Sequence, residues 1–281
     1  MKGAILFSTT NAASLNIMRH LEKDWKWKKK SEKSYSFSVC AKENCCSGVE
    51  AHGSDKEIID IEPPADLCEG PHRADYFLYA STHKSEAGTP ALTAHVPGNW
   101  GSADFGGKAK TLNMAYAAKL KQILQLLAEG AKKHKLDWPV NMEVDHHGPT
   151  PKNGKLPLIF VEIGSSPEQW ENEKAGAIVA EAMMKALFRP APEVKAYLGI
   201  GGGHYAPKFT PLMLGSKERA VGHVLAKYRA DEFDEKMLQQ AVEKTVEPLE
   251  GALIDWKGLS GEQRERILPI LEKAAMKWEK V

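Results

Sequence analysis

Pro139-Val140-Asn141-Met142-Glu143-Val144 leads directly into Asp145-His146-His147-Gly148-Pro149-Thr150, so a short apolar segment ends in an acid, two histidines and a Gly-Pro turn. The first half has the length and apolar content of a strand, and the second half carries metal-binding side chains where that strand ends. Enzymes of the α/β class build their sites at the ends of sheet strands. The stretch therefore indicates both a sheet and a site at its edge.

Three further segments repeat this layout of an apolar strand followed by polar, reactive side chains. They are residues 76–86, 158–166 and 196–205, whose polar ends read Ser-Thr-His-Lys-Ser-Glu, Glu-Ile-Gly-Ser-Ser and Gly-Gly-Gly-His-Tyr. Because the strands alternate with helical segments, the sequence predicts an α/β fold with a mixed or mostly parallel sheet flanked by helices. We expect a single catalytic domain over residues 1–281, built as one body or as two intimately packed α/β lobes.

Helix signals are clear at three places. Residues 110–135 carry apolar side chains at steps of three and four, which is typical of one buried helix face. Ser166 begins a capping box followed by a proline at the first helical position. Ser260 begins a second capping box, and the apolar stripe after it extends to Trp278. Pro269 lies inside that last helix and is expected to kink or split it.

The overall composition is that of an ordinary globular protein. The chain is 42% hydrophobic and 27% charged, with a formal net charge of +1, so a nucleic-acid partner has to be met by a local basic patch. No apolar run approaches the roughly 20 residues that span a bilayer. We expect a cytoplasmic protein with no membrane association and no obligate protein partner. The four cysteines contain no CxxC pair, which favours reduced thiols over a zinc or redox pair.

Several histidines and acids near the predicted strand ends are candidate zinc ligands. His83 and Glu86 have the H-x-x-E spacing, and His95 follows in the next segment. Imidazole nitrogen and carboxylate oxygen both bind zinc well. His146 and His147 would point to opposite faces in an extended backbone, although the Gly-Pro turn can relax that rule. We therefore predict a ligand role for His146 and a substrate or outer-shell role for His147.

The remaining strand ends offer a base, an orienting acid and hydrogen-bond donors. Glu162 ends an apolar strand, where burial would raise its pKa and suit it to proton transfer; helix capping and direct metal binding are the alternatives. Asp145 is a candidate for orienting a ring nitrogen, whereas His223 is expected to be an ordinary core or surface histidine. The glycines at 201–203 offer backbone N–H groups to a phosphate or an oxyanion. They do not form the GxGxxG pattern of a dinucleotide-binding fold.

Five motifs, taken in order, resemble those of the archaeal and plant type of D-aminoacyl-tRNA deacylase. The motifs are residues 81–86, 93–100, 143–150, 160–170 and 199–207, and the resemblance extends over essentially the whole chain. That family is zinc-dependent, with an α/β fold related to peptidyl-tRNA hydrolases and zinc carboxypeptidases. The resemblance implies that this chain hydrolyses the ester between a D-amino acid and the terminal ribose of tRNA, which is a proofreading reaction.

The residues and the resemblance together predict a metal-activated esterase acting on the acceptor end of D-aminoacyl-tRNA. We predict one or two zinc ions, with Glu162 taking the proton of water and returning it to the ribose hydroxyl. A D side chain would fit where an L side chain clashes. The metal ligands are drawn from His83, Glu86, His95, His146 and His204. Substrate contacts are predicted for His147, Lys84, Gly201, Gly202 and Gly203.

Two other functions are consistent with parts of the sequence. The first is a zinc-dependent amidase or peptidase, which needs the same activation of water. The second is a non-catalytic tRNA-binding module that uses the basic residues 25–30 and 132–135. The second leaves the strand-end motifs unexplained. The tryptophans of residues 25–30 are also expected to fold onto the core, and the lysines of 132–135 to complement a helix dipole.

Overall fold

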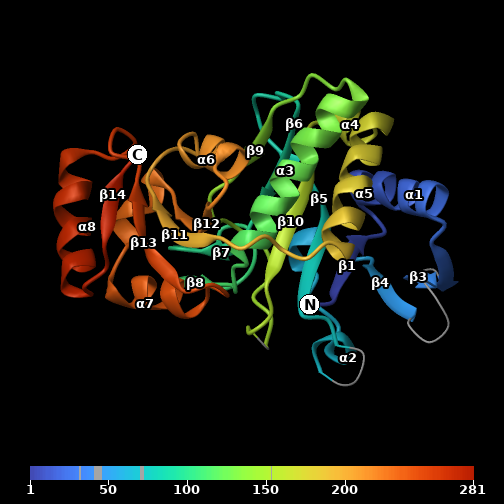
Figure 1. Cartoon of the computed structure of the whole chain (residues 1–281), viewed down its shortest axis with the longest axis horizontal. Helices are drawn as coiled ribbons and strands as arrows, with labels where there is room; N and C mark the ends of the chain where they lie inside the picture. Colours follow the sequence, from blue (N-terminus) through green and yellow to red (C-terminus); the bar gives the residue numbers. More distant parts are fainter. Residues whose placement is uncertain (32, 41–45, 70–72, 153) are drawn as a thin grey trace. The chain divides into compact units, whose positions relative to one another are not determined.

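The computed structural model describes residues 1–31, 33–40, 46–69, 73–152 and 154–281 (Figure 1). The chain divides into two compact units. Unit 1 comprises Met1–Thr93, Leu126–Val140 and Phe160–Pro190, and unit 2 comprises Ala94–Gln125, Asn141–Ile159 and Ala191–Val281. Among the described residues, no helix has both the length and the apolar character needed to cross a membrane.

An eight-stranded sheet has the strand order β2-β3-β4-β1-β5-β10-β6-β9. β1 pairs in parallel with β4 and β5, while β2, β3 and β4 form antiparallel pairs, so the sheet is mixed as predicted. Its strands are β1 (Gly3–Ser8), β2 (Lys28–Ser31), β3 (Ser34–Cys40), β4 (Cys46–Ser54), β5 (Tyr76–Lys84), β6 (Ala91–His95), β9 (Val140–Met142) and β10 (Leu158–Ser165).

The helices of unit 1 include α1 and α5, which pack against each other. Asn11 caps α1 by accepting a hydrogen bond from the backbone N–H of Ser14. The indole of Trp27 is buried and donates to Sδ of Met184, so this tryptophan folds onto the core as expected. The helical segments are α1 (Ala12–Trp25), η1 (Ile58–Asp60), α2 (Ala65–Cys68), α4 (Pro167–Trp170) and α5 (Glu173–Phe188).

The helix that was predicted to start at Ser166 is in fact two helices. The Ser166 side chain makes no capping hydrogen bond, and the Gln169 side chain accepts one from the backbone N–H of Ser165 rather than of Ser166. α4 ends after one turn, and Asn172 caps α5 by accepting from the N–H of Ala175. The prediction of a capping box at Ser166 was therefore wrong.

Unit 2 is built on a four-stranded parallel sheet with the order β12-β11-β13-β14. Buried apolar residues such as Leu198, Ile254 and Leu271 form its core. The elements of unit 2 are β7 (Gly98–Asn99), β8 (Thr111–Leu112), β11 (Lys195–Ile200), α6 (Phe209–Gly215), β12 (Arg219–Leu225), η2 (Lys227–Glu232), α7 (Glu235–Glu243), β13 (Leu249–Ile254), α8 (Gly261–Lys273) and β14 (Trp278–Lys280). α3 (Ala117–His134) has residues in both units.

The last helix confirms one prediction and corrects another. Ser260 and Gln263 form the predicted capping box at the start of α8. Pro269 lies within this helix without splitting it, and the helix ends at Lys273. Trp278, which was expected on the helix stripe, belongs to β14.

Candidate active site

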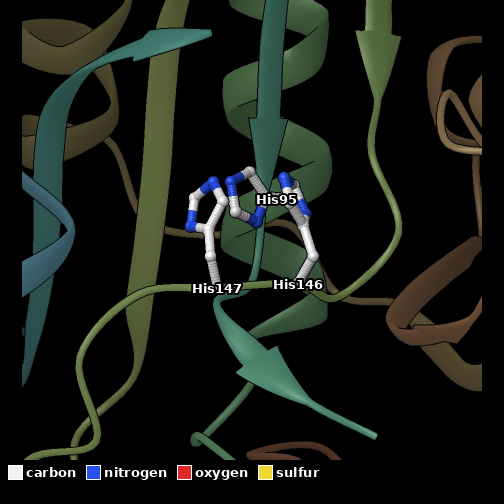
Figure 2. Close-up of side chains that lie close together, drawn as sticks. All are labelled: His95, His146 and His147. Atoms are coloured by element: carbon white, nitrogen blue, oxygen red, sulfur yellow. The ribbon is translucent and has the colours of Figure 1, made fainter. Parts of the chain in front are cut away.

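Three imidazoles lie together in unit 2 (Figure 2). His95 is the last residue of β6, whereas His146 and His147 lie in the turn that follows β9. One ring nitrogen from each histidine lies within 4.8 Å of the other two. The ring centroids of His95 and His146 are 4.3 Å apart, and those of His146 and His147 are 4.0 Å apart. Since imidazole nitrogen is a common zinc ligand, this group is a candidate metal site.

The backbone of the turn explains how two adjacent histidines face the same side. His147 has a φ of +38° and Gly148 a φ of +87°, both in the left-handed region. The backbone N–H of Gly98 donates to the carbonyl of His147 at 2.9 Å, which holds the turn against the chain that follows β6. The strand rule of alternating faces therefore does not apply here, and the turn relaxes it as the sequence suggested.

The hydrogen bonds of His95 and His146 leave one nitrogen of each ring suited to a metal. Nδ1 of His95 lies 3.1 Å from the carbonyl oxygen of Val96, and Nδ1 of His146 lies 2.8 Å from that of Val144. Because a carbonyl only accepts, Nδ1 carries the hydrogen and Nε2 of the neutral ring keeps its lone pair. Burial, reinforced by the neighbouring His147 and His95 rings, lowers the pKa of His146 well below its usual range. The neutral ring is the form that binds a metal.

Glu143 is a site residue that sequence reasoning missed. It follows β9 and its side chain is fully buried. Its Oε2 lies 3.4 Å from Nε2 of His146 and 3.1 Å from Nε2 of His204. Two ligands bound at 2.0–2.1 Å to a tetrahedral zinc ion are about 3.3 Å apart. Both distances match that spacing, so Glu143 belongs with the histidines as a candidate ligand.

Asp145 orients a histidine, as predicted, but not one of the three grouped rings. Its Oδ2 lies 2.6 Å from Nδ1 of His223, and its Oδ1 accepts from the N–H of Val224. His223 was expected in the core or on the surface, and it is buried in the core. The pair ties the histidine turn to β12.

A pocket of about 170 Å³ in unit 2 opens beside these histidines. Two of its aromatic side chains are largely exposed, since Phe105 is 69% and Tyr228 58% accessible. The volume suits a small group such as an amino-acid side chain, and exposed aromatic rings can stack on a base. The lining includes Trp100, Phe105, His146, His147, His204 and Tyr228.

Glu162 is a fully buried acid of unit 1. It lies within β10, which continues to Ser165, so it does not end its strand as expected. Its Oε1 accepts a hydrogen bond from the Ser81 hydroxyl at 2.8 Å, and its Oε2 accepts one from the Thr93 hydroxyl at 3.3 Å. Nδ1 of His83 is 3.7 Å from Oε2. The buried carboxylate is thus held in one orientation by polar neighbours.

Two of the predicted residues of unit 1 are on the surface. Lys84 and Glu86 are exposed at the end of β5, whereas His83 is buried. Within the described part of the chain Glu86 makes no ion pair, so the H-x-x-E spacing does not bring it to His83. The proposed ligand role of Glu86 and the substrate role of Lys84 stay predictions.

The glycine segment after β11 has fewer available donors than expected. The N–H of Gly201 donates to the carbonyl of Leu225 at 2.8 Å, and that of Gly202 donates to the carbonyl of Gly258 at 3.3 Å. The Gly203 N–H makes no hydrogen bond to a residue that the structure describes. Of the three N–H groups predicted to donate to a substrate, that of Gly203 is therefore the one still available in this conformation.

Comparison with known proteins gives consistent matches to one family. A model of the D-aminoacyl-tRNA deacylase family matches residues 71–279. A D-aminoacyl-tRNA deacylase of Pyrococcus abyssi is 36% identical over 93% of this chain and 93% of its own length. One of Pyrococcus furiosus is 40% identical over 69% of this chain and 68% of its own length. One of Methanosarcina mazei is 33% identical over 98% of this chain and 91% of its own length.

A solved structure is also similar to this chain. It is the crystal structure of a conserved protein of unknown function, with a TM-score of 0.85 and 27% sequence identity. The match covers 99% of this chain and 95% of that one. The likeness supports the α/β fold over the full length.

Proposed function

The chain belongs to the D-aminoacyl-tRNA deacylase family, and from that premise we propose that it hydrolyses the ester bond of D-aminoacyl-tRNA. The products are the free D-amino acid and the tRNA. Because aminoacyl-tRNA is made in the cytoplasm, the proposal includes a cytoplasmic location. The observation that carries the proposal is the group of His95, His146 and His147 beside a pocket of amino-acid size.

The donor set supports a bound zinc ion. His95 and His146 each use Nδ1 on a backbone carbonyl, the arrangement that fixes metal-binding rings in other proteins. We propose that the ligands come from these two rings together with Glu143 and His204, whose contact distances suit a shared ion. When bound, zinc would acidify a water molecule and polarise the ester carbonyl.

The side chains have separate tasks in this proposal. Glu143 would bind the same ion as His146 and His204, since its Oε2 lies beside the Nε2 atoms of both rings. His147 lines the pocket and contacts the substrate. Glu162 takes a proton from water on one carboxylate oxygen and returns it to the ribose oxygen as the ester breaks. The hydroxyls of Ser81 and Thr93 keep that carboxylate in one orientation.

Chirally matched substrates test the proposal directly. The purified full chain is incubated with D-aminoacyl-tRNA, with the same tRNA carrying the L-amino acid, and with small N-acyl amino acids. We expect release of the D-amino acid at a rate at least tenfold above that of the L-amino acid, and no cleavage of the amides. Preferred cleavage of the amides would replace the proposal with an amidase function.

A further inference from the structure

A second, larger hollow lies at the carboxyl edge of the parallel sheet in unit 2. Its volume is about 600 Å³. Loops that follow three neighbouring parallel strands contribute to it: Lys208 comes after β11, Lys227 after β12, and Lys257 after β13. The hollow is separate from the candidate metal ligands, none of which lines it.

The topology of the sheet marks this place as a ligand site. From β11 the chain crosses to β12 on one side, and from β13 it crosses to β14 on the other. The connections therefore diverge between β11 and β13. In open parallel sheets ligands bind at such a switch point, outside the carboxyl ends of the strands. The loops after these two strands meet there, where Gly202 donates to the carbonyl of Gly258.

The charges of the hollow favour an anion. Lys208, Lys227 and Lys257 are exposed, and none of their ammonium groups forms an ion pair with any residue in the described ranges. The one acid of the lining, Asp255, is buried, and its Oδ1 accepts a hydrogen bond from the N–H of Gly258 at 2.9 Å. Three cations against one acid leave the lining with a net charge of about +2.

Glycines allow the loops that line the hollow to approach each other closely. A Cβ atom at Gly258 would lie 2.6 Å from the backbone nitrogen of Gly202, which no side chain allows. Gly202 has a φ of +84°, and a Cβ there would press on Pro207. At Gly203 nothing lies within 4 Å of the Cβ position, so its backbone faces open space. A phosphate group can approach such a backbone closely.

Two short segments of the chain line both hollows of unit 2. Gly203 lines the lysine-bearing one and the next residue, His204, lines the histidine pocket. In the same way Lys227 lines the first and Tyr228 the second. The two hollows are therefore neighbours, and a substrate with its ester in one can place an attached phosphate in the other.

We propose that Lys208, Lys227 and Lys257 form a subsite for backbone phosphates of the single-stranded acceptor end of tRNA. The inference rests on the proposed function, because it assigns part of that substrate to this hollow. Lysine ammonium groups bind nucleic-acid phosphates without reading sequence. The subsite therefore contributes affinity for tRNA whichever amino acid the tRNA carries. Selection of the D-amino acid takes place in the histidine pocket.

The test replaces the three lysines by glutamine, singly and together, and compares two substrates. One is D-aminoacyl-tRNA, and the other is D-aminoacyl-adenosine, which has the ester but no phosphate. For the triple variant we expect KM for the tRNA to rise about tenfold or more with kcat unchanged, and KM for the nucleoside to stay the same. The slope of log KM against log salt concentration should fall by about 0.7 for each phosphate that a lysine no longer neutralises.

Matched controls separate this effect from a general reduction of positive charge. Lys217→Gln and Lys236→Gln remove exposed lysines of unit 2 that do not line the hollow. If the triple variant behaves like these controls on tRNA, the subsite is refuted while the deacylase function stands. An equal rise of KM for both substrates also refutes it, since the nucleoside carries no phosphate.

Binding measurements keep the inference testable if the chain proves inactive. Fluorescence anisotropy with uncharged tRNA reports on the lysines without any turnover, and unchanged affinity in the triple variant refutes the subsite. Inorganic phosphate and adenosine monophosphate are titrated as competitors. If phosphate or adenosine monophosphate binds to these lysines and tRNA does not displace it, the hollow is a site for a free phosphate compound. That result would overturn the assignment to tRNA.

Discussion

The carboxylate of Asp145 and the imidazole of His223 form a buried pair, with Oδ2 2.6 Å from Nδ1 and each side chain 1% exposed. Nε2 of the same ring lies 3.0 Å from the carbonyl oxygen of Lys244. Both ring nitrogens of His223 therefore face oxygen atoms that can accept a hydrogen bond. The pair connects β12 to the turn that carries His146 and His147.

Breaking this pair should destabilise unit 2. Asp145→Asn or His223→Gln leaves one member of a buried pair without its partner, which typically costs about 3–5 kcal/mol. Denaturant unfolding monitored by fluorescence measures the difference. The matched control is Asp231→Asn, which breaks an exposed ion pair with Arg266 and should change stability by no more than about 1 kcal/mol. If the buried and exposed variants lose the same unfolding free energy, the Asp145–His223 pair does not stabilise unit 2 more than an exposed ion pair does.

Glu143→Gln should lower both zinc content and deacylation. The substitution keeps the size of the side chain but removes the charge that faces Nε2 of His146 and His204. We expect zinc affinity to fall at least about tenfold, because the variant lacks the carboxylate proposed as a ligand and the loss of even an outer-shell partner costs about that much. Metal analysis of the purified variant and a deacylation assay are compared with Glu250→Gln, an exposed acid of unit 2. A variant with full zinc and full activity would exclude Glu143 from the site.

Removal of the metal should separate the roles of the two adjacent histidines. Treatment with a chelator is expected to abolish deacylation, and added zinc to restore it. His146→Ala should lose zinc, whereas His147→Ala should keep it and show a raised KM. Undiminished turnover in a sample shown to be metal-free would remove zinc from the mechanism. Loss of zinc from the His147 variant would reassign that ring as a ligand.

Much of the fold follows from local sequence signals, and the exceptions have physical causes. Apolar runs before polar ends marked β5, β10 and β11, because buried strands need them. The helix expected from residue 110 begins only at Ala117, since residues 111 and 112 pair with β7 instead. β3 was not anticipated, although Ser-Tyr-Ser-Phe-Ser-Val alternates as a half-buried strand does. The many charged residues before and after this segment made the alternation of polar and apolar side chains hard to recognise.

The sequence predicted which residue types form the site better than it predicted which residues contact each other. The grouping of His95 with His146 and His147 agrees with the expectation of imidazoles near strand ends. Glu143 was passed over because one acid beside an apolar segment does not reveal that it is fully buried. The pairing of Asp145 with His223 joins residues 78 positions apart in the chain, and no local spacing encodes such a contact.

Glu181 should make the stability of unit 1 depend on acid pH. Burial opposes ionisation, but hydrogen bonds from Lys185, Lys133 and His134 lower the pKa of Glu181 from 4.5 to about 2. The unfolded chain then binds more protons in that window, so the stabilisation is complete above pH 4.5 and is lost as pH falls through about 2. The advantage of the native chain over Glu181→Gln in unfolding free energy should shrink across this range. A Glu171→Gln variant, which alters an exposed acid, should show no such trend.

Lys121 should make the stability of unit 2 depend on alkaline pH, with stability again rising as pH rises. Its side chain is 1% exposed, and its Nζ donates to the carbonyl of Met213 at 2.7 Å. Burial lowers the pKa of Lys121 from 10.5 to about 8, which corresponds to a difference of about 3 kcal/mol between its two protonation states. Between pH 8 and 10.5 the unfolded chain binds more protons than the folded chain, so this residue makes stability rise with pH.

A comparison with Lys121→Met isolates that contribution, because other alkaline titrations are common to both proteins. The native chain should gain about 3 kcal/mol of unfolding free energy relative to this variant as pH rises from 8 to 10.5. The missing hydrogen bond to Met213 lowers the variant's stability at every pH and does not change the slope. Lys236→Met removes an exposed lysine, so its unfolding free energy should change with pH in the same way as that of the native chain. If the unfolding free energy of Lys121→Met also changes with pH as that of the native chain does, the ammonium group of Lys121 is not desolvated in the folded protein.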